Sequence, residues 1–194
     1  MKKIAVFCGA SLGFNDIYAN VARKLGVFLA QKNIEIVFGG GKFGMMGAIA
    51  DAALENGGKV TGVIPHFLKQ EEIEHTGIQQ MITTKNMSER KIIISKMVDA
   101  YWALPGGFGT LDEVMEALTL GQLQIEQKPI ALLNTNGFFN LLIQQFDRMV
   151  QEGFLKQENR NMVLVDDNIE NLYQEILNYK APKVSKIIHT VASK

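Results

Sequence analysis

Residues 100–113, AYWALPGGFGTLDE, join a short apolar run to a glycine-rich loop and then to the start of a helix. The run at 100–104 has the length and apolar character of a buried strand, and Pro105 ends it. The three glycines that follow allow the backbone to curl, with amide groups free to face a ligand. A helical pattern then runs from 111 to about 123. The stretch predicts one strand–loop–helix unit of an α/β fold.

The same unit recurs along the whole chain. Continuous apolar strands that alternate with helices are typical of a parallel sheet covered on both faces. We therefore predict a doubly wound, Rossmann-like three-layer α/β/α domain with a mainly parallel sheet over residues 1–180, followed by a tail at 181–194. The further strands are expected at 4–8, 34–38, 60–64, 79–83, 129–134 and 162–165. The further helices are expected at 16–32, 45–56, 88–98 with Ser88 as its cap, 138–150 and 169–179.

Composition narrows the class of protein. The chain has 194 residues, of which 47% are hydrophobic, so it can bury a sizeable core. Its 20 basic and 20 acidic residues balance, which leaves no basic field to draw nucleic acid. The single cysteine, Cys8, excludes a disulfide framework, and no stretch approaches the roughly 18 apolar residues of a membrane span. We expect a soluble cytoplasmic protein with no nucleic-acid or membrane partner.

Three glycine-rich loops follow predicted strands, at 9–13, 39–47 and 105–110. Ligands of doubly wound sheets bind where such loops converge at the carboxyl ends of the strands. The first loop offers the Ser11 hydroxyl, which either holds phosphate oxygens or belongs to an ordinary turn. The second matches GxGxxG, but the next strand ends without the acidic residue that holds the ribose of NAD. Close backbone approach to a phosphate or sugar near Gly41 is therefore favoured over NAD.

The charged residues beside the third loop have two interpretations. Thr110 and Glu113 fit an S/T-x-x-E capping box, in which Thr110 caps the helix and Glu113 folds back onto a backbone amide. Glu116 follows Glu113 by three residues, so both carboxylates share one helix face. Arg90 and Lys91 begin the preceding helix and could reach the same cluster, or remain solvated. The residues alone leave the structural and the catalytic interpretation of Glu113 open.

PGGFGTLDE at 105–113, together with SERK at 88–91, resembles the PGGxGTxxE and RK motifs of the LOG ("lonely guy") phosphoribohydrolases. Members of this family have often been labelled lysine decarboxylases. CGAS at 8–11, GGGKFGMMG at 39–47 and QKPIALLN at 127–134 also fit the pattern, and the resemblance extends to about residue 153. PGGxGT alone is shared with molybdenum-cofactor carrier proteins, whereas the arginine and glutamate at this spacing are more specific to LOG.

The resemblance implies hydrolysis of the N-glycosidic bond of cytokinin riboside 5′-monophosphates, and in some members of AMP, to free base and ribose 5-phosphate. It implies Arg90 and Glu113 as the catalytic pair, no metal or organic cofactor, and a homodimer. Asp112 stands where the family often has glutamate. The substrate contacts implied by the resemblance, together with the loop residues inferred above, are Ser11, Gly41, Glu72, Arg90, Lys91, Gly106, Gly107, Phe108, Gly109, Thr110, Leu111, Asp112, Glu113, Glu116 and Thr119.

Two other functions use the same features. A nucleotide or molybdenum-cofactor carrier would use the glycine loops without chemistry, although an anion carrier gains little from a carboxylate at Glu113. A pyridoxal-phosphate decarboxylase would need a Schiff-base lysine, and no lysine stands out in the sequence.

Overall fold

The computed structural model describes residues 1–69 and 73–183. Within these ranges seven strands form one sheet in the order β4-β3-β2-β1-β5-β6-β7, and every neighbouring pair is parallel. The strands are β1 (Lys3–Phe7), β2 (Glu35–Phe38), β3 (Val60–Pro65), β4 (Gln80–Thr84), β5 (Ala100–Ala103), β6 (Ile130–Leu133) and β7 (Val163–Asp166). The predicted parallel α/β architecture is confirmed.

The helices connect these strands. They are α1 (Asp16–Gln31), α2 (Gly44–Glu55), α3 (Met87–Met97), α4 (Phe108–Gln122), α5 (Asn140–Gln151), α6 (Gln157–Arg160) and α7 (Ile169–Asn178), with single 3-10 turns at His66–Leu68 and Thr135–Gly137. The four-residue α6 was not predicted, because one turn is too short to show a helical period. No helix in the described ranges is both long and apolar enough to cross a membrane.

Alternating strand residues face two separate cores. In β1, Ile4 and Val6 pack with α1, α2 and α7, whereas Ala5 and Phe7 pack with α3, α4 and α5. The five inner strands, β1, β2, β3, β5 and β6, are almost entirely buried, which explains why most of their residues are apolar. The helices therefore form two layers with the sheet between them.

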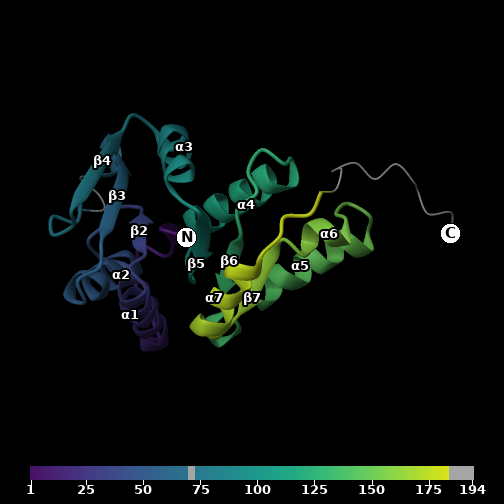
Figure 1. The fold of residues 1–194 in the computed structure, drawn as a ribbon, viewed down its shortest axis with the longest axis horizontal. Coiled ribbons are helices and arrows are strands. Elements are labelled where there is room, and N and C mark those ends of the chain that lie inside the picture. Colours follow the sequence, from purple (N-terminus) through teal and green to yellow (C-terminus); the bar gives the residue numbers. More distant parts are fainter. Residues whose placement is uncertain (70–72, 184–194) are drawn as a thin grey trace.

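The chain winds outward from the middle of the sheet in two directions. Its first part, purple to blue in Figure 1, passes from β1 through β2 and β3 to β4 at one edge. It then returns to place β5 on the other side of β1, and the green and yellow part continues to β7 at the opposite edge. The strand order thus reverses between β1 and β5, and ligands of doubly wound sheets bind at this point.

Two predicted helix caps are wrong. Helix α3 is capped by Asn86, whose Oδ1 accepts a hydrogen bond from the Glu89 amide at 2.9 Å, so Ser88 lies inside the helix. Helix α4 begins at Phe108 behind an extended Gly107, so Thr110 lies in its first turn. Both predictions placed the start too late, because they chose the nearest hydroxyl residue to the apolar pattern.

Candidate active site

The loops after β1, β2 and β5 are bound to one another at the point where the strand order reverses. The Gly9 amide donates to the Pro105 carbonyl at 3.1 Å, and the Gly9 carbonyl accepts from the Met45 amide at 3.2 Å. Gly9 therefore connects the β1 loop to both of the other glycine loops. The sequence supplies the glycines, and these hydrogen bonds bring them together.

Two glycines in these loops are required by close packing. A Cβ at Gly106 would overlap the Thr110 hydroxyl and lie 2.8 Å from the Gly9 amide. Gly44 has a positive φ of 66°, and a Cβ there would overlap the Ala10 carbonyl. Side chains at these positions would force the three loops apart.

Arg90 and Glu113 form a buried ion pair beside these loops. Arg90 lies on α3 and Glu113 on α4. The Arg90 Nη2 is 3.0 Å from the Glu113 Oε1, and each side chain is only 8% exposed. A Cβ at Gly39 would lie 2.6 Å from the same Nη2, so the glycine leaves room for the guanidinium. Glu113 thus turns toward Arg90, as the capping-box interpretation did not anticipate.

Two guanidinium nitrogens of Arg90 lack a strong hydrogen-bond acceptor among the described residues. Its Nη1 lies 3.9 Å from the Met87 sulfur, which is a weak acceptor. Its Nε is buried and has no hydrogen-bond partner among the described residues. Buried donors are normally paired, so an unpaired Nε beside a cavity is unusual.

A cavity of about 320 Å³ adjoins the ion pair. Its lining includes Cys8, Gly39, Leu68, Gly107, Gly109 and Thr110, in addition to Arg90 and Glu113. Burial, with a smaller contribution from the negative charge of Glu113, raises the pKa of the Cys8 thiol. Cys8 is therefore a protonated structural thiol rather than a nucleophile.

The start of α4 forms part of the wall of this cavity. The first amides of a helix have no acceptor within the helix, and Gly107 at the cap position has no side chain to supply one. Partial positive charge at a helix N-terminus favours anions. The wall that contains Gly107 and Gly109 is therefore suited to a phosphate, and Glu113 lines the same cavity.

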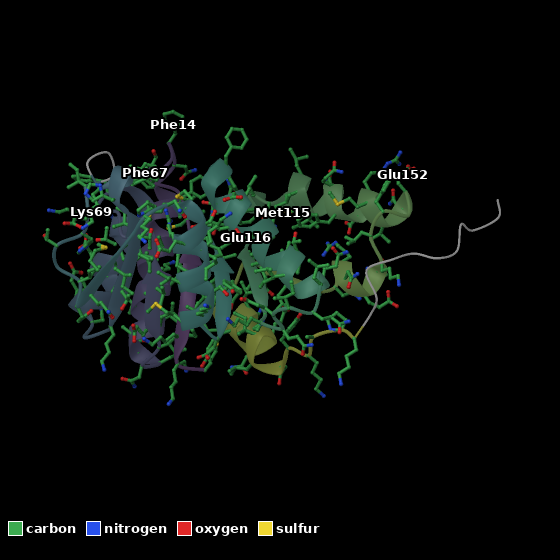
Figure 2. The ribbon with its side chains drawn as sticks, turned by 90° about the horizontal axis from the view of Figure 1, so that it is seen from above. Phe14, Phe67, Lys69, Met115, Glu116 and Glu152 are labelled. Atoms are coloured by element: carbon green, nitrogen blue, oxygen red, sulfur yellow. The ribbon has the colours of Figure 1, made fainter. Side chains whose placement is uncertain are left out.

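Lys91 joins the two helices on the outer side of the ion pair. Its Nζ lies 3.1 Å from the Asp112 Oδ2 and also pairs with Glu116. These contacts, with the Glu116 hydrogen bond as the largest cause, raise the pKa of the Lys91 amine. Glu116 is labelled on α4 in Figure 2. Lys91 is therefore held as a cation that ties α3 to α4.

Exposed phenylalanines surround the carboxyl edge of the sheet. Phe14 and Phe67, which follow β1 and β3, project from the same edge of the molecule in Figure 2. Phe43 and Phe108 follow β2 and β5 and are 58% and 92% exposed. Rings at this edge can stack on a flat apolar group of a ligand.

The structure distributes the predicted site residues over three neighbouring cavities. Arg90, Gly107, Gly109, Thr110 and Glu113 line the cavity described above. Ser11 and Gly106 line a second cavity of about 440 Å³. Lys91 and Glu116 line a third, of about 230 Å³, between α3 and α4.

Five predicted residues line none of these three cavities, and one cannot be placed. Thr119 bonds back to the Met115 carbonyl at 2.7 Å, and Gly41 is buried in a β-bridge with Glu74. The others are Phe108, Leu111 and Asp112. Glu72 lies outside the described residues.

Several residues that line the cavity beside the ion pair were not predicted as site residues, among them Met87 and Leu68. Met87 precedes Arg90 by three positions, and that spacing on one helix face was the available signal. Leu68 lies in the 3-10 turn after β3, and no periodic pattern in the sequence marks it.

Comparisons with known proteins show which proteins this chain resembles. The family model described as "Possible lysine decarboxylase" matches residues 46–176. Cytokinin riboside 5′-monophosphate phosphoribohydrolase LOG1 of Arabidopsis thaliana is 38% identical over 186 residues, which cover 96% of this chain and 87% of LOG1. LOG2 of the same plant is 39% identical over 191 residues, covering 96% of this chain and 89% of LOG2.

A solved structure shows the same fold. The molybdenum cofactor binding protein from the phototrophic bacterium Rippkaea orientalis aligns with a TM-score of 0.69 at 24% identity. The alignment covers 92% of this chain and 97% of that protein.

Proposed function

Because the chain belongs to the LOG family of cytokinin riboside 5′-monophosphate phosphoribohydrolases, we propose that it hydrolyses the N-glycosidic bond of these nucleotides. The products are the free base and ribose 5-phosphate. The observation that carries the proposal is the buried Arg90–Glu113 pair, which adjoins a glycine-lined anion seat. A carboxylate next to a phosphate site can aid catalysis when another part of the ligand becomes positively charged during the reaction.

The 5′-phosphate is held by backbone amides. The start of α4 offers them at Gly107 and Gly109, which line the cavity together with Arg90. Because a nucleoside lacks the phosphate, it cannot use this seat. The proposal therefore requires a strong preference for nucleoside monophosphates over nucleosides.

Glu113 acts at the ribose. As the bond from C1′ to the base breaks, the sugar becomes oxocarbenium-like and positive, and a carboxylate beside it stabilises the charge or activates water. Water adds its oxygen to C1′, and the departing base nitrogen takes up a proton. Arg90 orients both the substrate and Glu113, to which it is bound at 3.0 Å.

We extend the proposal to AMP as a second substrate, a homodimer and a cytoplasmic location. Exposed apolar residues on α3 and α4, among them Ile92 and Met115, support self-association. The single cysteine is a buried free thiol, which suits a reducing compartment. Light scattering coupled to gel filtration tests the dimer, and a monomer across micromolar concentrations contradicts it.

A hydrolysis panel tests the activity. Purified protein is incubated with isopentenyladenosine 5′-monophosphate, AMP, other nucleoside monophosphates and the matching nucleosides, and free base and ribose 5-phosphate are quantified. We expect release from the monophosphates and little from the nucleosides. No release from any nucleotide overturns the proposed function, and equal cleavage of nucleosides overturns the phosphate seat.

The solved relative named as a molybdenum cofactor binding protein raises the carrier alternative. A carrier would bind its ligand without turnover. Glu113 argues against this role, because a buried carboxylate next to an anion seat weakens anion binding. Binding of nucleotide with no base released after prolonged incubation would favour the carrier.

The family description as a lysine decarboxylase raises a pyridoxal-phosphate enzyme. Such an enzyme needs a lysine amine that loses its proton readily in order to form a Schiff base. Lys91 lies nearest to the ion pair in sequence, but its contacts with Glu116 and Asp112 raise its pKa and hold the proton. Absence of lysine decarboxylation in the presence of added pyridoxal phosphate tests this point.

A further inference from the structure

Residues 73–77, here called the strap, run back along the β2 loop. The Lys42 amide donates to the Ile73 carbonyl at 2.9 Å, and the His75 amide donates to the Gly40 carbonyl at 2.8 Å. Between them Gly41 and Glu74 form an antiparallel bridge. The strap therefore holds the backbone of the β2 loop on one side.

His75 fixes the strap in place. It is 5% exposed, its Nε2 lies 2.9 Å from the Asp51 Oδ1 on α2, and its Nδ1 accepts from the Gly77 amide at 3.1 Å. Because Nδ1 accepts a hydrogen bond, Nε2 is the ring nitrogen that donates to Asp51. The ring also meets the edge of Phe38, with centroids 6.5 Å apart. His75 thus joins the strap to α2 and to the end of β2.

Ile73, at the start of the strap, has an unusual backbone conformation. Ile73 has a φ of 45°, a left-handed conformation that is strongly disfavoured for a β-branched residue. Such strain persists only where the surrounding structure enforces it. Here the Ile73 carbonyl is engaged by Lys42, and His75 is engaged two residues later.

The β2 loop that the strap holds also faces the catalytic pair. Gly39 precedes Gly40, and the Cα of Gly39 is packed so closely on Arg90 that a Cβ would lie 2.6 Å from its Nη2. A shift of the loop toward or away from α3 would therefore move or release the guanidinium. The path from His75 to Gly40, Gly39, Arg90 and Glu113 consists of direct contacts.

We propose that His75 is a positioning residue, which holds the β2 loop against Arg90 so that the guanidinium stays aligned on Glu113. The inference rests on the proposed hydrolase function. Its consequence is that loss of the His75 contacts impairs turnover more than substrate binding, because misplacement of a catalytic group by about 1 Å can cost about a hundredfold in rate.

The first experiment separates positioning from stability. His75→Leu removes the two hydrogen bonds of the ring while keeping a side chain of similar size. His75→Gln restores a donor toward Asp51, and Asp51→Asn weakens the acceptor. Asp147→Asn is the matched control, because Asp147 pairs with Arg160 at 2.7 Å and so joins α5 to α6 outside the cavities described above. Hydrolysis of isopentenyladenosine 5′-monophosphate is measured at least 15 °C below each variant's unfolding midpoint.

We expect kcat to fall about tenfold or more in His75→Leu while KM changes by less than about threefold, with partial recovery in His75→Gln. The kcat of Asp51→Asn should lie between those of His75→Leu and His75→Gln, and the kcat of Asp147→Asn should match that of the wild type. An unchanged kcat per folded His75→Leu enzyme overturns the proposal and leaves His75 a purely structural residue.

The second experiment does not depend on hydrolysis. Amide hydrogen exchange of peptides covering residues 39–45 should be faster in His75→Leu than in the wild type or in Asp147→Asn. Unchanged exchange overturns the proposal even if activity falls. If the wild-type protein cleaves no nucleotide, the proposed function fails, and faster exchange in this arm still supports the hold of His75 on the β2 loop.

Discussion

Glu113 pairs with Arg90 across two helices, and both side chains are withdrawn from water. A buried ion pair contributes little net stability compared with apolar residues of similar size, because desolvation offsets the attraction. Its presence next to a cavity is better explained by chemistry than by folding. A substitution that removes the charge of Glu113 but keeps its shape therefore separates a chemical role from a structural one.

Glu113→Gln keeps the size and one oxygen to accept from Arg90, but it cannot stabilise positive charge at C1′. We expect kcat to fall at least about a hundredfold while nucleotide binding persists. Base release and calorimetric binding of AMP measure the two effects. Retained hydrolysis would return Glu113 to a structural role.

Gly39→Ala tests the contact on Arg90. The new Cβ would lie 2.6 Å from the Arg90 Nη2 and 2.9 Å from the Met46 sulfur. Met46 can yield, but the Arg90 guanidinium is buried and paired with Glu113, so we expect a lower melting temperature and a fall in activity of about tenfold or more.

Gly121→Ala is the matched control for this variant. Its Cβ would likewise displace a flexible end, the Met162 methyl, but in the last turn of α4 away from Arg90. It should leave activity unchanged. Equal loss of activity in both variants would contradict a specific role for Gly39.

At the scale of elements, helix α3 delivers Arg90 and Lys91 from its first turns, so its start determines where they lie. The Asn86 side chain accepts from the Glu89 amide at 2.9 Å, and the Glu89 carboxylate accepts from the Lys85 amide at 2.6 Å. These two bonds form a reciprocal cap of the kind that hydroxyl residues often supply. Ser88 is exposed inside the helix and makes no such contact.

Asn86→Ala should therefore destabilise the protein by about 1 kcal/mol, because an orphan amide loses its acceptor. Ser88→Ala, the matched change two residues later, should alter stability by less than about 0.5 kcal/mol. Urea unfolding followed by circular dichroism measures both. A larger loss of stability in Ser88→Ala than in Asn86→Ala would instead indicate that Ser88 caps the helix.

On the scale of the whole molecule, Glu126 connects three elements beneath the cavity between α3 and α4. Its carboxylate accepts from the Ser95 hydroxyl of α3 and from the Tyr101 hydroxyl of β5, the latter at 2.6 Å. Burial alone would raise the pKa of Glu126, but these hydrogen bonds and the nearby Lys128 outweigh it and lower the pKa. The network joins the connection after α4 to the sheet.

A carboxyl whose pKa is lower in the folded state stabilises the protein above its ordinary value of 4.5. That stability is lost as pH falls from 4.5 through the lower folded value. Glu126→Gln should therefore reduce the free energy of unfolding at neutral pH and make it less sensitive to acid below 4.5. Urea unfolding between pH 3 and 7 checks this, with Glu158→Gln on exposed α6 as the control; equal slopes in the wild type and Glu126→Gln would contradict it.

Local pattern was sufficient to predict the architecture and the loops of the site, but not the contacts within it. The apolar runs at β1, β2 and β5 and the glycines after them lie where the sequence indicates, because both signals are carried by neighbouring residues. The helix starts at Asn86 and Gly107 were misjudged, since several polar or glycine residues compete for each cap. The catalytic roles of Arg90 and Glu113 stay predictions.

By itself the sequence determined that this chain folds as a parallel α/β sheet with glycine loops at the strand ends, because periodicity and backbone freedom are local properties. Only the tertiary structure decided that Glu113 pairs with Arg90, 23 residues away on another helix. The same holds for His75, whose contacts with Asp51 and Gly40 depend on where the strap crosses the β2 loop. Distances between elements follow from strand order and close packing, and neither is encoded in any single stretch of residues.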